Sequence, residues 1–160
     1  MSHVLPVPKA VKDLFDDLLG RPVTVNPTDP PKSADIQRSL VALYTDDRLQ
    51  LVAVIGMDFE LTAYAGAAIG LIPPGGAEAC IEDKAISKMI GENAIEICNI
   101  LAGLINAAEA PRVKLHQTFL PGDSPPMDAI RHLNALGRRL DLKVDVSGYG
   151  GGTISLALAG

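Results

Sequence analysis

The sequence predicts a single α+β domain in which long amphipathic helices pack on a largely antiparallel sheet. The chain has 160 residues, a length typical of one domain. Its hydrophobic fraction of 48% and charged fraction of 21% are those of a globular protein with a sizeable core. Helical and β-rich segments follow one another in mixed order, with hairpin patterns between neighbours, which favours antiparallel strands. We therefore treat residues 1–160 as one domain.

The chain opens with a helix pattern and a short strand. Residues 7–19 predict the helix, because apolar side chains recur there at helical spacing and Gly20 follows as a terminator. A strand is expected at residues 23–25. Residues 27–32 contain three prolines and predict a surface loop, since proline cannot donate a backbone hydrogen bond.

A hairpin and a second helix come next. The β-rich runs 39–45 and 49–55 are separated by three polar residues, which is a hairpin pattern. Asp58 is expected to cap a helix that continues to the breaker Pro73–Gly76, because aspartate is a preferred N-cap residue.

The longest helix is expected at residues 82–108, with Glu82 and Asp83 in its first turn, where acidic side chains complement the helix dipole. At about 100° per residue, this helix divides into two faces. The face expected to join the core comprises Ile86, Met89, Ile90, Ala94, Ile97, Leu101, Leu104 and Ile105. The other face carries a row spaced by four, three and four residues: Glu92, Glu96, Asn99 and Gly103.

The last third of the chain predicts a strand at 113–120, an amphipathic helix at 126–140, and two closing strands at 142–146 and 153–158. The glycine-rich segment 148–152 lies between the last two strands. It lacks the Lys-Ser/Thr and the following helix of a phosphate-binding loop, so we interpret it as a hairpin turn.

Composition excludes several classes of function. The net charge of -5 and the absence of Trp argue against nucleic-acid binding, which uses clustered cations and aromatic stacking. No unbroken apolar run reaches the length of a membrane span, and the first twenty residues lack the layout of a secretory signal, so a cytoplasmic protein is expected. Cys80 and Cys98 lack the spacing of a zinc or redox site, and a buried, inert thiol is expected at Cys98.

The polar row on the long helix is not what helix stability favours. Carboxylates at positions 92 and 96 repel each other by a few tenths of a kcal/mol, and Asn99 is a mediocre helix former. The ordinary interpretation is a solvated helix face. The functional interpretation is that Glu96 and Asn99 contact a ligand or a partner.

A resemblance to a known family favours the functional interpretation. The stretch Ala85–Gly103, AISKMIGENAIEICNILAG, resembles the signature helix of the CheC/CheX/FliY phosphatases of bacterial chemotaxis, in which Glu-x-x-Asn precedes an Asn-Ile-Leu-Ala-Gly-like run. The likeness spans nearly the whole chain: VKDLFDDLLGRPV resembles the first helix and strand of CheX-type proteins, DFELTAYAGAAIG their second helix, TFLPG a strand ending in proline, and GGTISLALA the last strand. Because KDLFDDLLG lacks a second Glu-x-x-Asn, the single-motif CheX type is implied.

The resemblance implies a phosphatase that hydrolyses the aspartyl phosphate of a CheY-like response regulator. Glu96 and Asn99 are then the catalytic pair, with Asn99 orienting the attacking water and Glu96 contacting a lysine of the regulator. Glu92 and Gly103 belong to the substrate-binding surface. The regulator supplies Mg²⁺, so the chain needs no cofactor or metal site of its own, and a homodimer formed through the sheet is also implied. An amide suits this role because it donates and accepts hydrogen bonds at once, and phosphoryl transfer depends mainly on alignment and charge neutralisation.

The alternative is a non-catalytic CheX-like module that binds a receiver or a partner subunit, or only dimerises. The sequence departs from the family pattern at three points, of which the first two favour this alternative. Glu92 stands where the family often has Asp or Ser, 21 residues separate Asn99 from Pro121, slightly fewer than usual, and the helical segment 126–140 has no clear counterpart.

Two histidines carry no chemical pattern. His116 is expected to face solvent or to make a structural hydrogen bond. His132 is placed beside Arg131, Arg138 and Arg139 on the fourth helix, where a solvated basic face is expected.

Overall fold

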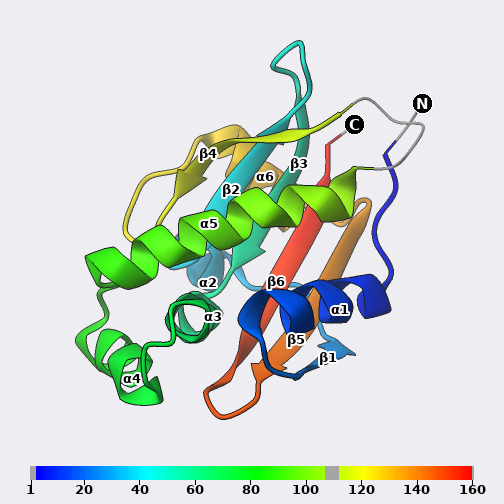
Figure 1. Cartoon of the computed structure of the whole chain (residues 1–160). Coiled ribbons are helices and arrows are strands. Elements are labelled where there is room, and N and C mark those ends of the chain that lie inside the picture. The colour runs from blue at the N-terminus through cyan, green and yellow to red at the C-terminus, as the bar shows by residue number, and fades with distance from the viewer. Residues whose placement is uncertain (1–2, 107–111, 160) are drawn as a thin grey trace.

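The computed structural model describes residues 3–106 and 112–159, and within them the chain forms one six-stranded sheet with helices on both faces (Figure 1). The strand order is β1-β5-β6-β3-β2-β4, and every neighbouring pair is antiparallel. The strands are β1 (Val23–Pro27), β2 (Leu40–Thr45), β3 (Leu51–Met57), β4 (Lys114–Phe119), β5 (Arg139–Val146) and β6 (Gly150–Leu158). The predicted α+β class with an antiparallel sheet is confirmed.

Six helices accompany the sheet in the described part of the chain: α1 (Pro8–Leu19), α2 (Ser33–Gln37), α3 (Phe59–Ile69), α4 (Pro74–Asp83), α5 (Lys88–Ile105) and α6 (Met127–Asn134). Figure 1 shows α1, α3 and α5 on one face of the sheet and α2 and α6 behind it. Helix α4 packs on α3 and the start of α5, through a small cluster that includes Ala63, Ala77 and Ile90. We call the side covered by α1, α3 and α5 the front face.

The main core lies between the front face of the sheet and its three helices. Helix α1 contributes Phe15, α3 contributes Leu61, and α5 contributes Ile97, all of which are fully buried. A smaller core on the back face packs Ile36 of α2 and Leu133 of α6 against the strands. Because both faces of the central strands are covered, β2 and β3 are almost uniformly apolar and buried rather than alternating.

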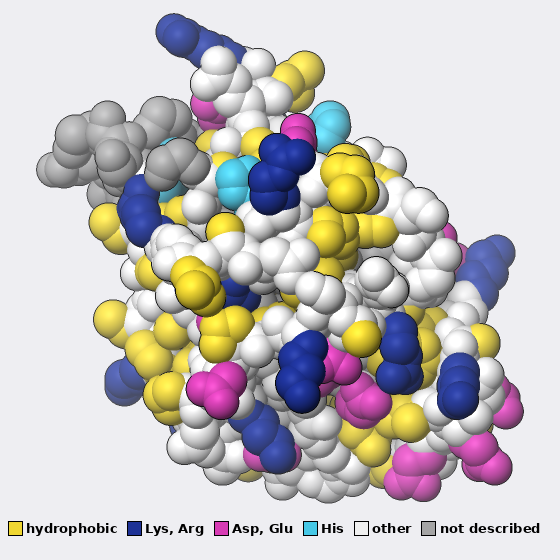
Figure 2. Space-filling model, turned by 180° about the vertical axis from the view of Figure 1, so that it is seen from behind, with side chains coloured by type: hydrophobic (Ala, Val, Ile, Leu, Met, Phe, Trp, Pro, Cys, Tyr) yellow, Lys and Arg dark blue, Asp and Glu magenta, His cyan; other side chains and the backbone are white. Residues whose placement is uncertain are grey.

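The back of the molecule carries a mixed surface (Figure 2). Lys and Arg side chains lie there singly or in small groups among acidic and apolar ones, without gathering into a field of one sign. None of the described helices is both long and apolar enough to cross a lipid bilayer.

The elements of the first half lie close to their predicted positions. Helix α1 ends at Gly20, which adopts the left-handed conformation with φ of 67° and donates its backbone N–H to Asp16 O. Strands β2 and β3 form the predicted hairpin. Asp58 caps α3 as predicted, because its side chain accepts a hydrogen bond from the backbone N–H of Leu61 at 2.8 Å.

The longest helix was predicted with the wrong start. Residues 82–87 do not open α5; Glu82 and Asp83 instead end α4, and α5 begins after its N-cap Ser87. The predicted breaker at Pro73–Gly76 starts α4, because a proline at the first helical position loses no hydrogen bond. The predicted C-terminal end of this helix, residues 107 and 108, lies outside the described residues.

The segment 126–140 is also shorter as a helix than predicted. Helix α6 ends at Asn134, and Arg139 already belongs to β5, so Arg138 and Arg139 do not lie on a basic helix face with His132. The apolar residue that extended the predicted pattern, Leu136, is 87% exposed. Two smaller differences are the short helix α2, which the proline-rich pattern did not predict, and Pro27, which ends edge strand β1 rather than opening the loop.

Candidate functional site

Helix α5 is fixed to the rest of the molecule along its inner face. Ser87 caps it, with its Oγ accepting from the Ile90 backbone N–H at 3.4 Å. The buried residues of this face are Ile90, Gly91, Ala94, Ile97, Cys98, Leu101, Ala102 and Ile105. Next to them, Asn93 donates from Nδ2 to the Gly66 carbonyl oxygen of α3 at 2.9 Å. The helix is therefore a rigid support for whatever its other face carries.

The outer row of α5 consists of Glu92, Glu96, Asn99 and Gly103, and all four residues are exposed. Glu96 and Asn99 are one helical turn apart, a spacing that places Cβ atoms about 5–6 Å from each other. Within residues 3–106 and 112–159, no hydrogen bond or ion pair involves the side chain of Glu92, Glu96 or Asn99. The structure thus brings all four predicted site residues to one open face.

Large apolar side chains flank this row. Met89 is 63% exposed, Ile100 is 37% exposed, and Ile95 is 36% exposed. Met89 was predicted to join the core, which is wrong: it lies seven residues before Glu96, nearly two full turns, and therefore on the same side of the helix. An exposed surface that combines apolar side chains with carboxylates fits a protein partner better than a small metabolite.

The polar side chains of the outer row can bind and orient hydrogen-bonding groups of a ligand or partner. A carboxamide can accept a hydrogen bond from a water and donate one to another oxygen, whereas a carboxylate accepts from cations and amides. Among the described residues there is no group of three or more His, Cys, Asp or Glu side chains that could hold a metal ion.

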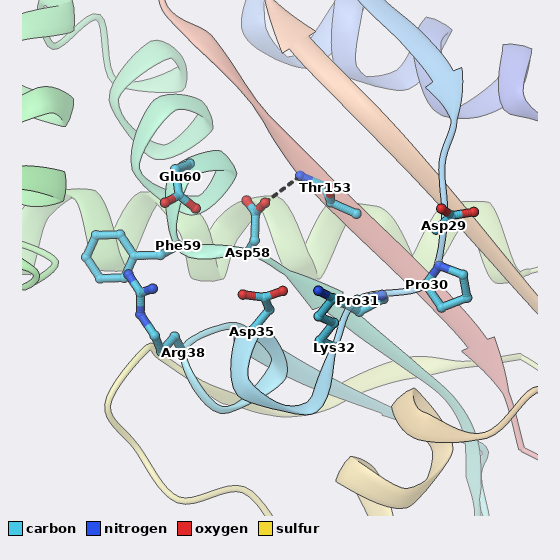
Figure 3. A pocket seen from close by; sticks show the side chains of 10 residues that line it. All are labelled: Asp29, Pro30, Pro31, Lys32, Asp35, Arg38, Asp58, Phe59, Glu60 and Thr153. Atoms are coloured by element: carbon cyan, nitrogen blue, oxygen red, sulfur yellow. Dashed lines mark hydrogen bonds between the residues drawn. The ribbon is translucent and has the colours of Figure 1, made fainter.

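A second polar hollow lies beside the start of α3, next to α2 and the loop that follows β1 (Figure 3). It has a volume of about 300 Å³ and is lined by Asp29, Pro30, Pro31, Lys32, Asp35, Arg38, Asp58, Phe59, Glu60 and Thr153. The carboxylate of Asp58 is hydrogen-bonded within the fold, since besides capping α3 it accepts from the Thr153 backbone N–H at 2.9 Å. Burial raises the pKa of Asp58 to about 6, against these hydrogen bonds, which favour its charged form.

The hollow differs from the outer row in where its charged groups lie. Its other charged residues, Asp29, Lys32, Asp35, Arg38 and Glu60, are mostly exposed on the loop after β1, on α2 and at the start of α3. It contains no histidine or cysteine that could act as a base or nucleophile. Sequence reasoning identified Asp58 only as a helix cap, and the structure gives it that role.

The remaining candidates are structural. Cys98 is fully buried, and burial raises the pKa of its thiol to about 12, so the predicted inert thiol is confirmed. His116 is exposed on β4, as expected. The predicted antiparallel hairpin between β5 and β6 is confirmed, but its turn is shorter than predicted: Gly150–Gly152 belong to β6, and the turn lies at residues 147–149, with Gly148 at φ of 81°.

Comparison with known proteins places the fold. No family model matches the sequence, and no curated protein matches it either. Among solved structures, the chain is similar to CheX in the CheX–CheY–BeF3–Mg²⁺ complex from Borrelia burgdorferi, with a TM-score of 0.58 at 14% identity, covering 95% of this chain and 94% of that one.

Two further structures show the range of this likeness. CheX from Desulfovibrio desulfuricans has a TM-score of 0.51 at 16% identity, covering 94% of this chain and 95% of that chain. FliM in the FliG–FliM complex from H. pylori has a TM-score of 0.52 at 6% identity, covering 94% and 85%. The chain has a CheC-like fold. At these identities the likeness establishes the arrangement of helices and strands, and the roles of Glu92, Glu96, Asn99 and Gly103 stay predictions.

Proposed function

We propose that this CheC-like protein is a phosphatase that hydrolyses the aspartyl phosphate of a CheY-like receiver. The observation that carries the proposal is the outer row of α5, where Glu96 and Asn99 stand one turn apart, exposed and without a bond to the described part of the chain. The similar fold of CheX, crystallised with CheY, supports a receiver as the partner. A cytoplasmic setting fits that partner.

In the proposed reaction each group has one task. Asn99 orients a water for attack on the phosphorus, and Glu96 binds a lysine of the receiver. Glu92 and Gly103 contribute to the docking surface, together with the flanking Met89. The receiver's own Mg²⁺ neutralises the phosphoryl oxygens, so this chain brings no cofactor. Alignment of this kind suffices because an acyl phosphate is already activated towards hydrolysis.

The test is the decay of a phosphorylated receiver from the same cell, with and without the protein. Wild type is expected to accelerate the decay, and N99A is expected to lose on the order of 10² to 10³ in rate, the usual cost of removing one positioned polar group. Gln37→Ala is the matched control, because it removes an exposed carboxamide from α2, behind the sheet. Absence of any acceleration by wild type, over all receivers tried, would exclude the enzyme.

The second candidate function is a binding module without chemistry. The specific observation in its favour is Glu92, whose longer side chain lies one turn before Glu96 on the same open face. The FliM structure similar to this chain was solved in a complex with FliG, which supports use of this fold for assembly. A receiver that binds wild type and N99A equally, with no change in dephosphorylation, would favour the module.

A homodimer formed through the sheet is part of the same proposal. Strands β1 and β4 end the sheet, and each is paired on one side only among the described residues. An unpaired strand edge is a ready template for pairing with another strand. Light scattering is expected to give the mass of two chains. The mass of one chain would exclude the dimer but would not bear on the proposed site.

A further inference from the structure

One buried hydroxyl connects the sheet to the turn of α5 that carries Asn99. Tyr44 lies on β2, its side chain is fully buried, and its Oη donates to the Cys98 carbonyl oxygen at 2.6 Å. The Cys98 carbonyl and the Asn99 N–H belong to the same planar peptide unit. A bond to that oxygen therefore fixes the peptide plane from which the Asn99 side chain extends.

The sheet is distorted at this tyrosine and regular on either side of it. Between Tyr44 and Thr45 the pairing with β3 slips by one residue, which leaves Val52 as the extra residue. Between Leu43 and Tyr44 the pairing with β4 slips as well, which leaves His116 as the extra residue. Bulges of this kind increase the local twist and re-aim side chains, and they are frequent beside active sites. Both neighbours of β2 thus adjust at the residue that reaches α5.

The fold does not need this hydroxyl to satisfy the helix. In the interior of an α-helix a carbonyl oxygen accepts the N–H four residues on, so the Cys98 carbonyl has a partner without Tyr44. A phenylalanine would fill the same space without bringing a polar group into the core, where a hydroxyl is costly unless it is bonded. Burial holds the pKa of Tyr44 well above its ordinary value, so the hydroxyl keeps its proton as a donor.

The geometry points to Tyr44 as a positioning residue for Asn99. Its hydroxyl holds the peptide unit between Cys98 and Asn99 at a fixed height and rotation over the sheet, so that the carboxamide meets the receiver's phosphoryl group in one orientation. This inference rests on the proposed phosphatase function, and it adds a residue that never touches the substrate. Small displacements matter in such a site, because a 1 Å misplacement can cost about 10²-fold in rate.

The protein contains a matched control for this bond. Tyr149 also donates from Oη to a backbone carbonyl oxygen at the same distance of 2.6 Å, but its acceptor, Ile72, lies between α3 and α4 and not on α5. Y44F and Y149F therefore each remove one hydrogen bond from a tyrosine hydroxyl to a backbone carbonyl oxygen, buried at Tyr44 and part-buried at Tyr149. Both are expected to lower stability to a similar small extent, and only Y44F is expected to lower kcat for receiver dephosphorylation, by roughly tenfold, with KM for the receiver unchanged.

Combining Y44F with N99A distinguishes a positioning effect on Asn99 from a general loosening of the structure. If Tyr44 acts through Asn99, then Y44F added to N99A causes no further loss of rate, because the group it positions is already absent. A further loss in the double variant equal to that of Y44F alone would overturn the inference. Equal kcat values for Y44F and Y149F would do the same, while N99A would still report whether the phosphatase proposal holds.

The remaining outcomes also decide the question. If the wild type does not accelerate dephosphorylation of the receiver, the phosphatase proposal is excluded, and the positioning role of Tyr44 is excluded with it. If Y44F does not fold, the wild type supplies a second measurement by NMR relaxation. The backbone N–H order parameter at Asn99 is expected near the rigid value of about 0.85, and a flexible value below about 0.6 would show that nothing fixes this peptide unit.

Discussion

Charged side chains are paired and buried at Arg139 and Asp141 of β5, whereas they are exposed and unpaired on the outer row of α5 among the described residues. Arg139 and Asp141 lie on β5 with side chains 8% and 6% exposed, and they form a bidentate pair at 2.8 and 2.9 Å. Arg139 also donates from Nη1 to the carbonyl oxygens of Leu133 and Ala135, both at 2.7 Å. The carboxylates of the outer row are exposed and have no such partners in the described part of the chain.

The difference distinguishes polar groups that serve the fold from polar groups available to a partner. The guanidinium on β5 ties the C-terminal end of α6 to the sheet, so its charge is paired within the molecule. On α5 the inner face already supplies the packing, and the outer row adds mutual repulsion without any compensating bond. This contrast predicts that changes at β5 alter stability and changes on the outer row alter function.

The largest expected effect is at the buried pair. Arg139→Met keeps most of the side-chain volume but leaves the Asp141 carboxylate buried without a partner. We expect the free energy of unfolding to fall by about 3–5 kcal/mol, the usual cost of breaking a buried ion pair from one side. Urea denaturation followed by circular dichroism measures it.

Arg131→Met is the matched control for that experiment, since Arg131 pairs with Asp128 at 3.3 Å on α6, with side chains 75% and 77% exposed. No measurable loss of stability is expected there. A similar loss in both variants would mean that burial does not decide the contribution of these pairs, and the contrast between β5 and α5 would lose its basis.

The next effect concerns Asp58, which is partly buried and accepts hydrogen bonds from two backbone N–H groups rather than from a cation of the described residues. Its pKa is about 6 in the folded protein and 3.8 in a solvated chain, so the folded state retains the proton longer as pH rises. The free energy of unfolding should therefore fall between about pH 4 and pH 6, by about 3 kcal/mol in total, at 1.36 kcal/mol per pKa unit.

Asp58→Asn tests this origin of the pH dependence. The variant cannot ionise, and it can accept only one of the two backbone N–H bonds through its single oxygen, so it should be less stable at all pH values. Its free energy of unfolding should nevertheless lack the fall between about pH 4 and pH 6. The same pH dependence in wild type and variant would assign it to another group.

The sequence predicted most of the fold because the elements carry strong local patterns. The α1 stripe, the hairpin of β2 and β3, and the Asp58 cap each follow from residues close to one another in the chain. The errors arose where one pattern fits two structures. Pro73–Gly76 suits both a loop and the first turn of a helix, and the apolar residues of 82–87 continue the period of α5 although the chain turns there.

The candidate site was predictable for the same reason, since Glu92, Glu96, Asn99 and Gly103 lie on one helix and the helical period alone aligns them. The bond from Tyr44 to Cys98 was not predictable, because it joins residues 54 positions apart and lies where the register shifts on both sides of β2. Nor was the pairing of Arg139 with Asp141, because the helical pattern was extended into β5. Long-range contacts of this kind become visible only in the folded chain.

The smallest effects come from the same substitution made at two glycines, one in the α3–α5 packing and one on the outer row of α5. At Gly66 on α3, an added Cβ would lie 2.7 Å from the Ile90 carbonyl oxygen and 2.8 Å from Ile90 Cγ2. Gly66→Ala should therefore force α5 outwards and lower the free energy of unfolding by about 1–3 kcal/mol, as overpacking usually does. Thermal unfolding measures the loss, and an unchanged Tm would mean that the two helices can separate freely.

Gly103→Ala should act in the opposite direction on stability. An added Cβ at this position of the outer row meets no atom within 4 Å, so alanine gains helix propensity of about 0.5–1 kcal/mol without a clash. If the row receives a receiver, however, the extra methyl group stands in the docking surface, and binding should weaken while the protein becomes more stable. Titration of the receiver beside thermal unfolding separates the two effects. Greater stability with unchanged receiver binding and dephosphorylation would exclude Gly103 from the docking surface and limit the functional part of the row to its polar members.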